Sequence, residues 1–191
     1  MLKRSTHPNL LDSDHSILVL VDMQTRLLAA MPEAQAREML VNCLKLLQAA
    51  TLLGVPVLVT EQYPKGLGST EPEIIRNLPP GIEVFEKTGF SCCAAEGFNR
   101  SLARTERRQV ILLGQEAHVC VLQTALELLD QSYQVYVLED ALCSRQAEHK
   151  SSALRRMRQH GGTVLNHESV LFEWLKDAKH PDFKVISSLI R

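Results

Sequence analysis

Short apolar runs alternate with longer segments of helical periodicity along the chain. The runs are rich in Val, Ile and Leu, which favours buried strands, while Leu and Ala recur every three or four residues in the segments between them. This pattern predicts six strands, at 16–22, 55–61, 81–87, 107–114, 133–140 and 161–169. It predicts helices at 36–54, after residue 120, at 145–160 and at 170–175.

The alternation of strands and helices indicates the fold class. Repeated β-α units with nearly continuous apolar strands are typical of a parallel sheet covered by helices on both faces. We therefore expect a three-layer α/β/α, Rossmann-like fold. The sequence has no internal repeat and no linker long enough to separate domains, so we expect one domain over residues 1–191.

Composition and charge indicate the cellular location of the protein and the classes of partner it binds. A net charge of −1 gives no sign of nucleic-acid binding, and no apolar run approaches the roughly 20 residues that span a bilayer. The five cysteines lack the spacing of a disulfide scaffold, and no apolar stretch typical of a secretory signal follows the basic N-terminus. We expect a cytoplasmic protein without membrane partners. No glycine-rich dinucleotide or P-loop motif follows any strand, so no cofactor is predicted.

The candidate catalytic residues lie where the predicted strands end. In a parallel sheet these carboxyl ends share one edge, and ligands bind there, near the point where strand order reverses. Asp22 ends the first predicted strand, Lys87 ends the third, and Cys120 follows the fourth. An aspartate can accept a thiol proton, a lysine can stabilise both anions, and a cysteine can act as the nucleophile.

Cys120 stands where an apolar strand has ended and an amphipathic helix begins. Backbone N–H groups and the helix dipole at that position favour a thiolate and suit an oxyanion hole. A buried, inert cysteine is the alternative for Cys120. For Asp22, the alternative is a helix cap or a structural ion pair with Lys87, and Lys87 taken alone reads as an exposed lysine near a turn.

Four segments of the chain resemble the isochorismatase-like cysteine hydrolases. They read LVLVDMQ, TEQYPKGLGSTEPEI, FEKTGFSCC and GQEAHVCVLQTALELLDQSYQVYVLEDALCSR, and the similarity runs from about residue 16 to 175. The resemblance implies a six-stranded parallel sheet, homo-oligomers and an Asp–Lys–Cys triad of Asp22, Lys87 and Cys120. It also implies a cis peptide between Gln115 and Glu116, and an oxyanion hole formed by the backbone N–H groups of Glu116 and Cys120.

The chain departs from two better-known groups within that family. Nicotinamidases bind a metal through an aspartate and two histidines after the second strand, but the segment EQYPKGLG has neither residue type. We therefore predict no metal and no nicotinamidase activity. Isochorismatases cleave a vinyl ether without a cysteine nucleophile. Because Cys120 is present, hydrolysis of an acyl C–N or C–O bond is the better prediction.

Five further side chains are candidates for binding the substrate: Gln24, Leu27, Tyr63, Phe90 and His118. All lie close after a predicted strand end. Ordinary core or interface packing explains the three apolar and aromatic residues equally well. Gln24 can orient Asp22 or a substrate amide, or only cap a turn, and His118 suits a pocket wall better than a role as the base.

These observations predict a cysteine-dependent, metal-independent hydrolase. Its substrate would be a small molecule with an amide, ureido or ester bond, cleaved through a covalent acyl-enzyme. The alternative is an interaction or scaffold protein that keeps the fold with weak or vestigial catalysis. Thiol reactivity distinguishes the two, because only the hydrolase needs a reactive Cys120.

Overall fold

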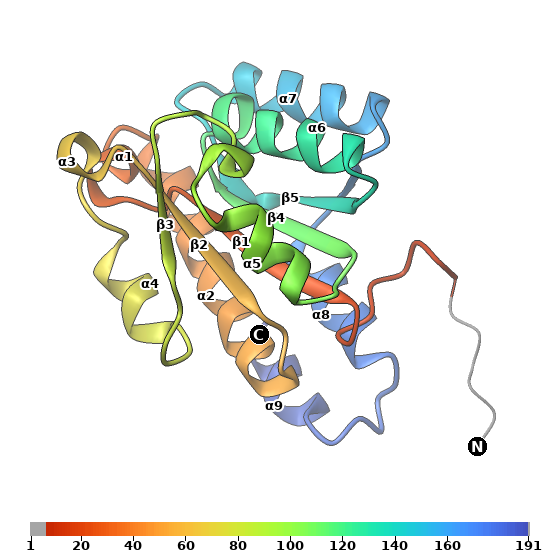
Figure 1. The fold of residues 1–191 in the computed structure, drawn as a ribbon. Helices are drawn as coiled ribbons and strands as arrows, with labels where there is room; N and C mark the ends of the chain where they lie inside the picture. The colour runs from red at the N-terminus through yellow and green to blue at the C-terminus, as the bar shows by residue number, and fades with distance from the viewer. Residues whose placement is uncertain (1–6, 191) are drawn as a thin grey trace.

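A six-stranded, all-parallel sheet runs through the centre of the molecule (Figure 1). A computed structural model describes residues 7–190. The strands are β1 (Ser16–Val21), β2 (Val57–Gln62), β3 (Val84–Lys87), β4 (Gln109–Gln115), β5 (Gln134–Cys143) and β6 (Thr163–Leu165). Their order is β3-β2-β1-β4-β5-β6, so the direction of winding reverses between β1 and β4. That switch point is where α/β sheets place their ligands.

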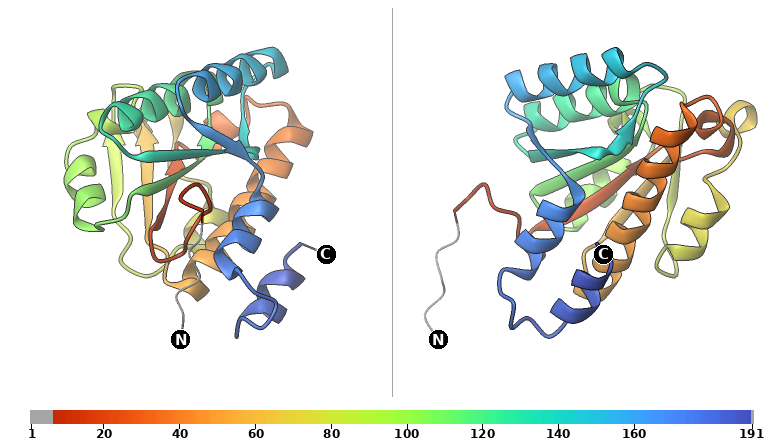
Figure 2. Two further views of the ribbon diagram at one scale, coloured as in Figure 1. Left: turned by 90° about the vertical axis from the view of Figure 1, so that its right-hand side faces the viewer. Right: turned by 180° about the vertical axis from the view of Figure 1, so that it is seen from behind.

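Helices cover both faces of the sheet, which confirms the predicted three-layer fold (Figure 2). One face carries α2 (Glu33–Leu53), α4 (Pro72–Asn77), α8 (His167–Leu175) and α9 (Phe183–Ser188). The other face carries α5 (Phe98–Arg104), α6 (Leu122–Asp130) and α7 (Ala147–Gln159). Two short helices, α1 (Thr25–Leu28) and α3 (Pro64–Leu67), lie in the connections at the carboxyl edge. No helix among residues 7–190 is long and apolar enough to cross a membrane.

Strand β1 explains why the apolar runs are nearly continuous. Leu18 and Leu20 point to the core under α2 and α8, whereas Ile17, Val19 and Val21 point to the core under α5 and α6. Because both faces are buried, every position of β1 is excluded from water. Parallel sheets covered on both sides require this composition.

Three predicted strands differ from the structure by three residues or more at one end. The third begins at Val84 rather than at 81. The fifth strand does not end at Asp140 but continues to Cys143, because pairing with β4 shifts register between Leu112 and Gly114 and then resumes. The sixth strand is limited to Thr163–Leu165. The segment after it turns into α8, whose start is capped by the Asn166 side chain accepting from the N–H of Ser169.

The helix bounds also differ from the predictions. Helix α2 begins at Glu33 directly after Pro32, and it ends as expected before Gly54, which is left-handed at φ 66°. Helix α7 begins at Ala147 rather than at 145. Helices α1, α3, α4, α5 and α9 were not predicted, because none is longer than seven residues and so none shows two full turns of periodicity.

Candidate active site

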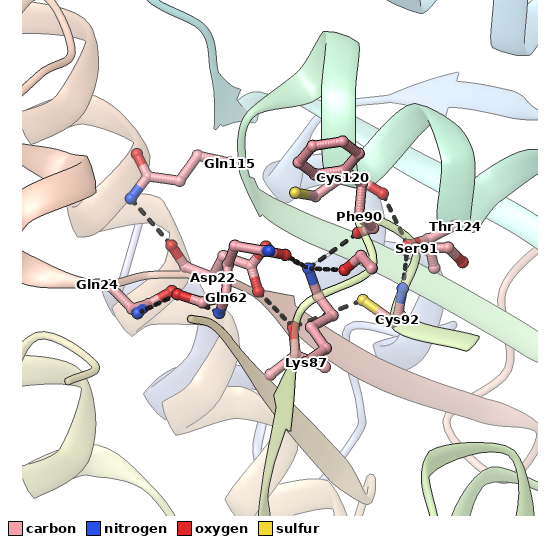
Figure 3. Close-up of polar contacts among 12 residues, drawn as sticks. Asp22, Gln24, Gln62, Lys87, Phe90, Ser91, Cys92, Gln115, Cys120 and Thr124 are labelled. Atoms are coloured by element: carbon pink, nitrogen blue, oxygen red, sulfur yellow. Dashed lines mark hydrogen bonds and ion pairs between the residues drawn. The ribbon is translucent and has the colours of Figure 1, made fainter. Parts of the chain in front are cut away.

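Asp22 and Lys87 form a buried ion pair at the carboxyl edge of the sheet. Asp22 directly follows β1 and Lys87 ends β3, so the two side chains meet across the end of β2. Lys87 Nζ lies 2.8 Å from Asp22 Oδ2, and both side chains have 0% exposure (Figure 3). The chain turns sharply after β1 because Asp22 has φ 51°, a left-handed conformation that Asp tolerates better than most residues.

The ammonium group of Lys87 is fully occupied. Besides Asp22 it donates to Gln62 Oε1 at 2.7 Å and to the carbonyl oxygen of Phe90 at 2.8 Å. An ammonium has three N–H donors, and these three short bonds use all of them. Lys87 therefore acts as a fixed positive charge, with no proton directed at a substrate.

The carboxylate of Asp22 is held from its other side by Thr60. The Thr60 hydroxyl donates to Asp22 Oδ1 at 2.8 Å, while Lys87 binds the second oxygen. The backbone of Asp22 is also bonded, because Gln115 Nε2 donates to its carbonyl oxygen at 3.1 Å. Bonds from β2 and β3 thus fix the plane of the carboxylate, and the bond from β4 holds the backbone that carries it.

Cys120 lies beside this ion pair in a π-helical turn, Ala117–Val121, that precedes α6. Burial raises the pKa of the Cys120 thiol above its ordinary value, and the negative charge of Asp22 and a hydrogen bond with it add to the increase. The positive charge of Lys87 acts in the opposite direction but is outweighed. The expectation of a thiolate favoured by a helix start is therefore wrong for the resting protein.

The turn that carries Cys120 begins with the expected cis peptide bond between Gln115 and Glu116. The carbonyl oxygen of Glu116 accepts from the N–H groups of Val119 and Val121 at 3.1 and 3.2 Å. Glu116 Oε2 bonds Arg145, which ties the turn to the segment before α7. The residue pair proposed for the oxyanion hole thus flanks one tight turn.

Comparison with known proteins agrees with this fold. A family model described as the isochorismatase domain matches residues 16–169. The chain belongs to the isochorismatase domain family. The matched range runs from β1 into α8 and includes every strand of the sheet.

Two relatives are similar to this chain in sequence over most of its length. The secreted isochorismatase effector Isc1 of Phytophthora sojae is 46% identical over 150 residues, which cover 76% of this chain and 71% of the effector. Isochorismatase domain-containing protein 2 of Bos taurus is 39% identical over 176 residues, covering 92% of this chain and 83% of the relative.

Solved structures show the same architecture. The MAR1 ribonuclease from Caenorhabditis elegans superimposes with a TM-score of 0.88 at 34% identity, covering 94% of this chain and 91% of that chain. The YcaC gene product from Escherichia coli, described as an octameric hydrolase of unknown specificity, gives a TM-score of 0.89 at 24% identity, with 97% and 91% covered. This second likeness shows the fold alone.

The candidate lining residues of this isochorismatase domain divide into two kinds. Tyr63 and Phe90 are 54% and 52% exposed, on the loops that follow β2 and β3. Leu27, by contrast, is half-buried against the core under α2. The two aromatic rings are therefore available to a ligand, whereas the packing of Leu27 matches the structural alternative.

The two polar candidates are already bonded. Gln24 is buried, and its side chain donates to the carbonyl oxygens of Gln62 and Gly68 and accepts from the N–H of Gln62. It therefore holds the end of β2 against the following loop. His118 Nδ1 lies 3.0 Å from Ser144 Oγ, and burial lowers the pKa of its ring. These contacts match a structural or pocket-wall role for His118.

Three site residues were missed by sequence reasoning: Thr60, Gln62 and Thr124. Thr60 and Gln62 alternate along β2, so they lie on the same side of that strand beside Asp22 and Lys87. Thr124 Oγ1 donates to the carbonyl oxygen of Cys120 and accepts from the N–H of Cys92. Three consecutive polar residues, Thr60, Glu61 and Gln62, end a strand that begins with apolar residues, and this buried polar run was the signal that could have identified the first two.

A groove of about 1380 Å³ lies away from this site, between the segment before β1 and α8. Its lining includes Asp12 and Glu173, and both are bonded within the protein: Asp12 to Lys176 at 2.6 Å and Glu173 to the N–H of Leu11 at 2.7 Å. Because it opens at the amino edge of the sheet, it plays no part in the site at the carboxyl edge. Within residues 7–190, no three His, Cys, Asp or Glu side chains group as metal ligands.

Proposed function

We propose that this protein is a metal-independent cysteine hydrolase that cleaves a small amide, ureido or ester bond. One observation carries the proposal: the ends of β1 and β3 and the turn after β4 bring a carboxylate, an ammonium and a thiol together in a desolvated site. This constellation suits nucleophilic catalysis with a positioned base. Membership in the isochorismatase domain family supports the hydrolase class.

In the proposed mechanism the resting thiol is neutral and Asp22 is its proton acceptor. As Asp22 takes the proton, the Cys120 sulfur attacks the substrate carbonyl carbon and a C–S bond forms. The oxyanion is held by the backbone N–H groups of Glu116 and Cys120. The tetrahedral intermediate expels the amine or alcohol, which takes the proton from Asp22 as it leaves.

The second half of the reaction releases the acyl group. Asp22, again a carboxylate, accepts a proton from a water molecule that attacks the thioester carbon. The C–S bond breaks, the acid is released and the sulfur recovers its proton from Asp22. Lys87 stays charged throughout because its three N–H groups are all bonded, so its role is electrostatic.

The proposal extends to the cellular location and the oligomeric state. All five cysteines are free, as expected for a protein of the cytoplasm, where we propose that it acts. A relative from Phytophthora sojae is named a secreted effector, so location differs from the proposal in at least that relative. We also propose a homo-oligomer, as the Escherichia coli YcaC product is described as octameric.

The test is the alkylation of individual cysteines by iodoacetamide, followed by mass spectrometry between pH 5 and 10. Although the resting thiol is neutral, Asp22 can accept its proton as the sulfur attacks, so we expect Cys120 to react at pH 7 ahead of Cys43 and Cys143. Both Asp22→Asn and Lys87→Ala should change its pH profile. Incubation with small amides and ureides should then give an intact-mass increase that Cys120→Ala abolishes. Cys120 reacting no faster than Cys43 would exclude the hydrolase and leave a scaffold function.

A further inference from the structure

Thr60 is bonded to Asp22 through both its backbone and its side chain. Thr60 is paired with Val21 in the β1–β2 register, so it lies next to the end of β1. The carbonyl oxygen of Thr60 accepts from the N–H of Asp22 at 3.2 Å, and its hydroxyl donates to Asp22 Oδ1 at 2.8 Å. Thr60 has 0% exposure, so no water competes for either bond.

The hydroxyl of Thr60 has a fixed polarity. A hydroxyl has one proton, and since an ionised carboxylate only accepts, that proton goes to Asp22. Cys92 Sγ lies 3.5 Å from the same hydroxyl oxygen, so its S–H is the donor in that contact. Cys92 is fully buried, and burial raises the pKa of its thiol to about 12, which keeps the proton on sulfur. Donors therefore run in one direction, from Cys92 through Thr60 to Asp22.

The identity of the side chain at position 60 is informative. Valine has the same branched shape, occupies the neighbouring positions 57 and 59, and avoids the cost of burying a hydroxyl. Only the O–H group distinguishes Thr60 from valine in this place. That group binds the one carboxylate to which the proposed mechanism assigns the proton transfers.

We infer that Thr60 is a positioning residue, which fixes the Asp22 carboxylate and stabilises its charged form so that it can accept the proton of Cys120. This inference rests on the proposed function. Lys87 holds Oδ2 and Thr60 holds Oδ1, so the carboxylate is fixed at both oxygens. The charged and titratable groups facing Asp22 in the described chain are Lys87 from β3, Cys120 from the π-helical turn, and Cys92 from the 3₁₀ turn Cys92–Ala94.

The test compares Thr60→Val, Thr60→Ala and Thr60→Ser in the full chain, with iodoacetamide as the probe. The rate of Cys120 alkylation is measured against pH by peptide mass spectrometry. Loss of a donor to a carboxylate disfavours its charged form. We therefore expect the acid-side midpoint of the profile to move to higher pH by about one unit in the Val and Ala variants. Thr60→Ser keeps the hydroxyl and should restore the wild-type midpoint.

Thr70→Val is the matched control. The Thr70 hydroxyl also donates to a buried carboxylate, Glu61 Oε1 at 2.7 Å, but Glu61 is not part of the proposed site. Its removal should lower stability without moving the Cys120 midpoint. Unchanged midpoints in both Thr60→Val and Thr60→Ala, with a reactive wild-type Cys120, would refute the role of Thr60 alone. A wild-type Cys120 no faster than Cys43 would instead refute the proposed function, and the inference with it.

Discussion

The buried ion pair leads to a prediction that can be worked out from its contacts. Lys87→Met keeps an unbranched side chain of nearly the same length but removes the ammonium. Asp22 is then left as a buried carboxylate bonded to the Thr60 hydroxyl and the Cys120 thiol, with no positive charge beside it, while Gln62 and the carbonyl oxygen of Phe90 each lose a donor. Breaking a buried pair in this way costs about 3–5 kcal/mol of the free energy of unfolding.

Two more variants complete a double-mutant cycle: Asp22→Asn alone, and the double variant that removes both charges. Asp22→Asn preserves the left-handed backbone at φ 51°, because Asn adopts this conformation as readily as Asp. The double variant Asp22→Asn, Lys87→Met has no unpaired charge, and its remaining cost is that of unsatisfied polar groups, about 1–3 kcal/mol. We therefore expect the double variant to be more stable than Lys87→Met alone.

Urea denaturation of the wild type, both single variants and the double variant measures this coupling. In a parallel thermal denaturation, a cost of about 4 kcal/mol corresponds to a decrease in the melting temperature of about 8–16 °C for a chain of this size. The reasoning is refuted if the costs of the single variants add up in the double variant. Additive costs would mean that the two groups do not stabilise each other and that the pair is not a unit.

Two further predictions concern the stability of the fold. Burial raises the pKa of the Cys43 and Cys92 thiols, the latter to about 12 from an ordinary 9.0, so the unfolded chain loses these protons first. Below pH 9 these two thiols should not affect the free energy of unfolding. Between pH 9 and 12 the free energy of unfolding should fall by about 1.4 kcal/mol per pH unit for each thiol. Cys43→Ala should reduce this dependence on pH, as measured by urea denaturation at each pH. Gly114→Ala should destabilise the chain by about 3–5 kcal/mol in the same assay. The reason is that Gly114 has φ +116° and an added Cβ would lie 2.1 Å from the carbonyl oxygen of Val21. A loss of less than about 1 kcal/mol would contradict the close approach of β1 and β4.

The sequence predicted the sheet and the edge that carries the site because both depend on local patterns. Apolar runs of five to seven residues identify buried strands without knowledge of their partners, and parallel pairing then brings all carboxyl ends to one edge. Asp22, Lys87 and Cys120 could be selected on this basis alone. The structure places Asp22 and Lys87 2.8 Å apart.

The positions of Thr60 and Gln62 could not be derived in the same way. Thr60 lies within β2 and Gln62 is its last residue, and their bonds to Asp22 and Lys87 depend on how β2 is placed between β1 and β3. The extension of β5 to Cys143 has a similar origin, since it follows a register shift opposite Leu112 and Gly114. Strand register is a property of the assembled sheet, and periodicity within one segment does not contain it.

The wrong expectation for Cys120 changes how the proposed chemistry must work. Sequence reasoning weighed the helix dipole and a nearby lysine, both local or pairwise effects that favour a thiolate. The structure adds desolvation and the charge of Asp22, and these raise the pKa of the thiol. Since Lys87 already binds Asp22, Gln62 and Phe90, it has no further N–H group to stabilise a sulfur anion or an oxyanion. In the proposed mechanism, therefore, the proton passes from Cys120 to Asp22 as the sulfur attacks, and the backbone of the turn holds the oxyanion.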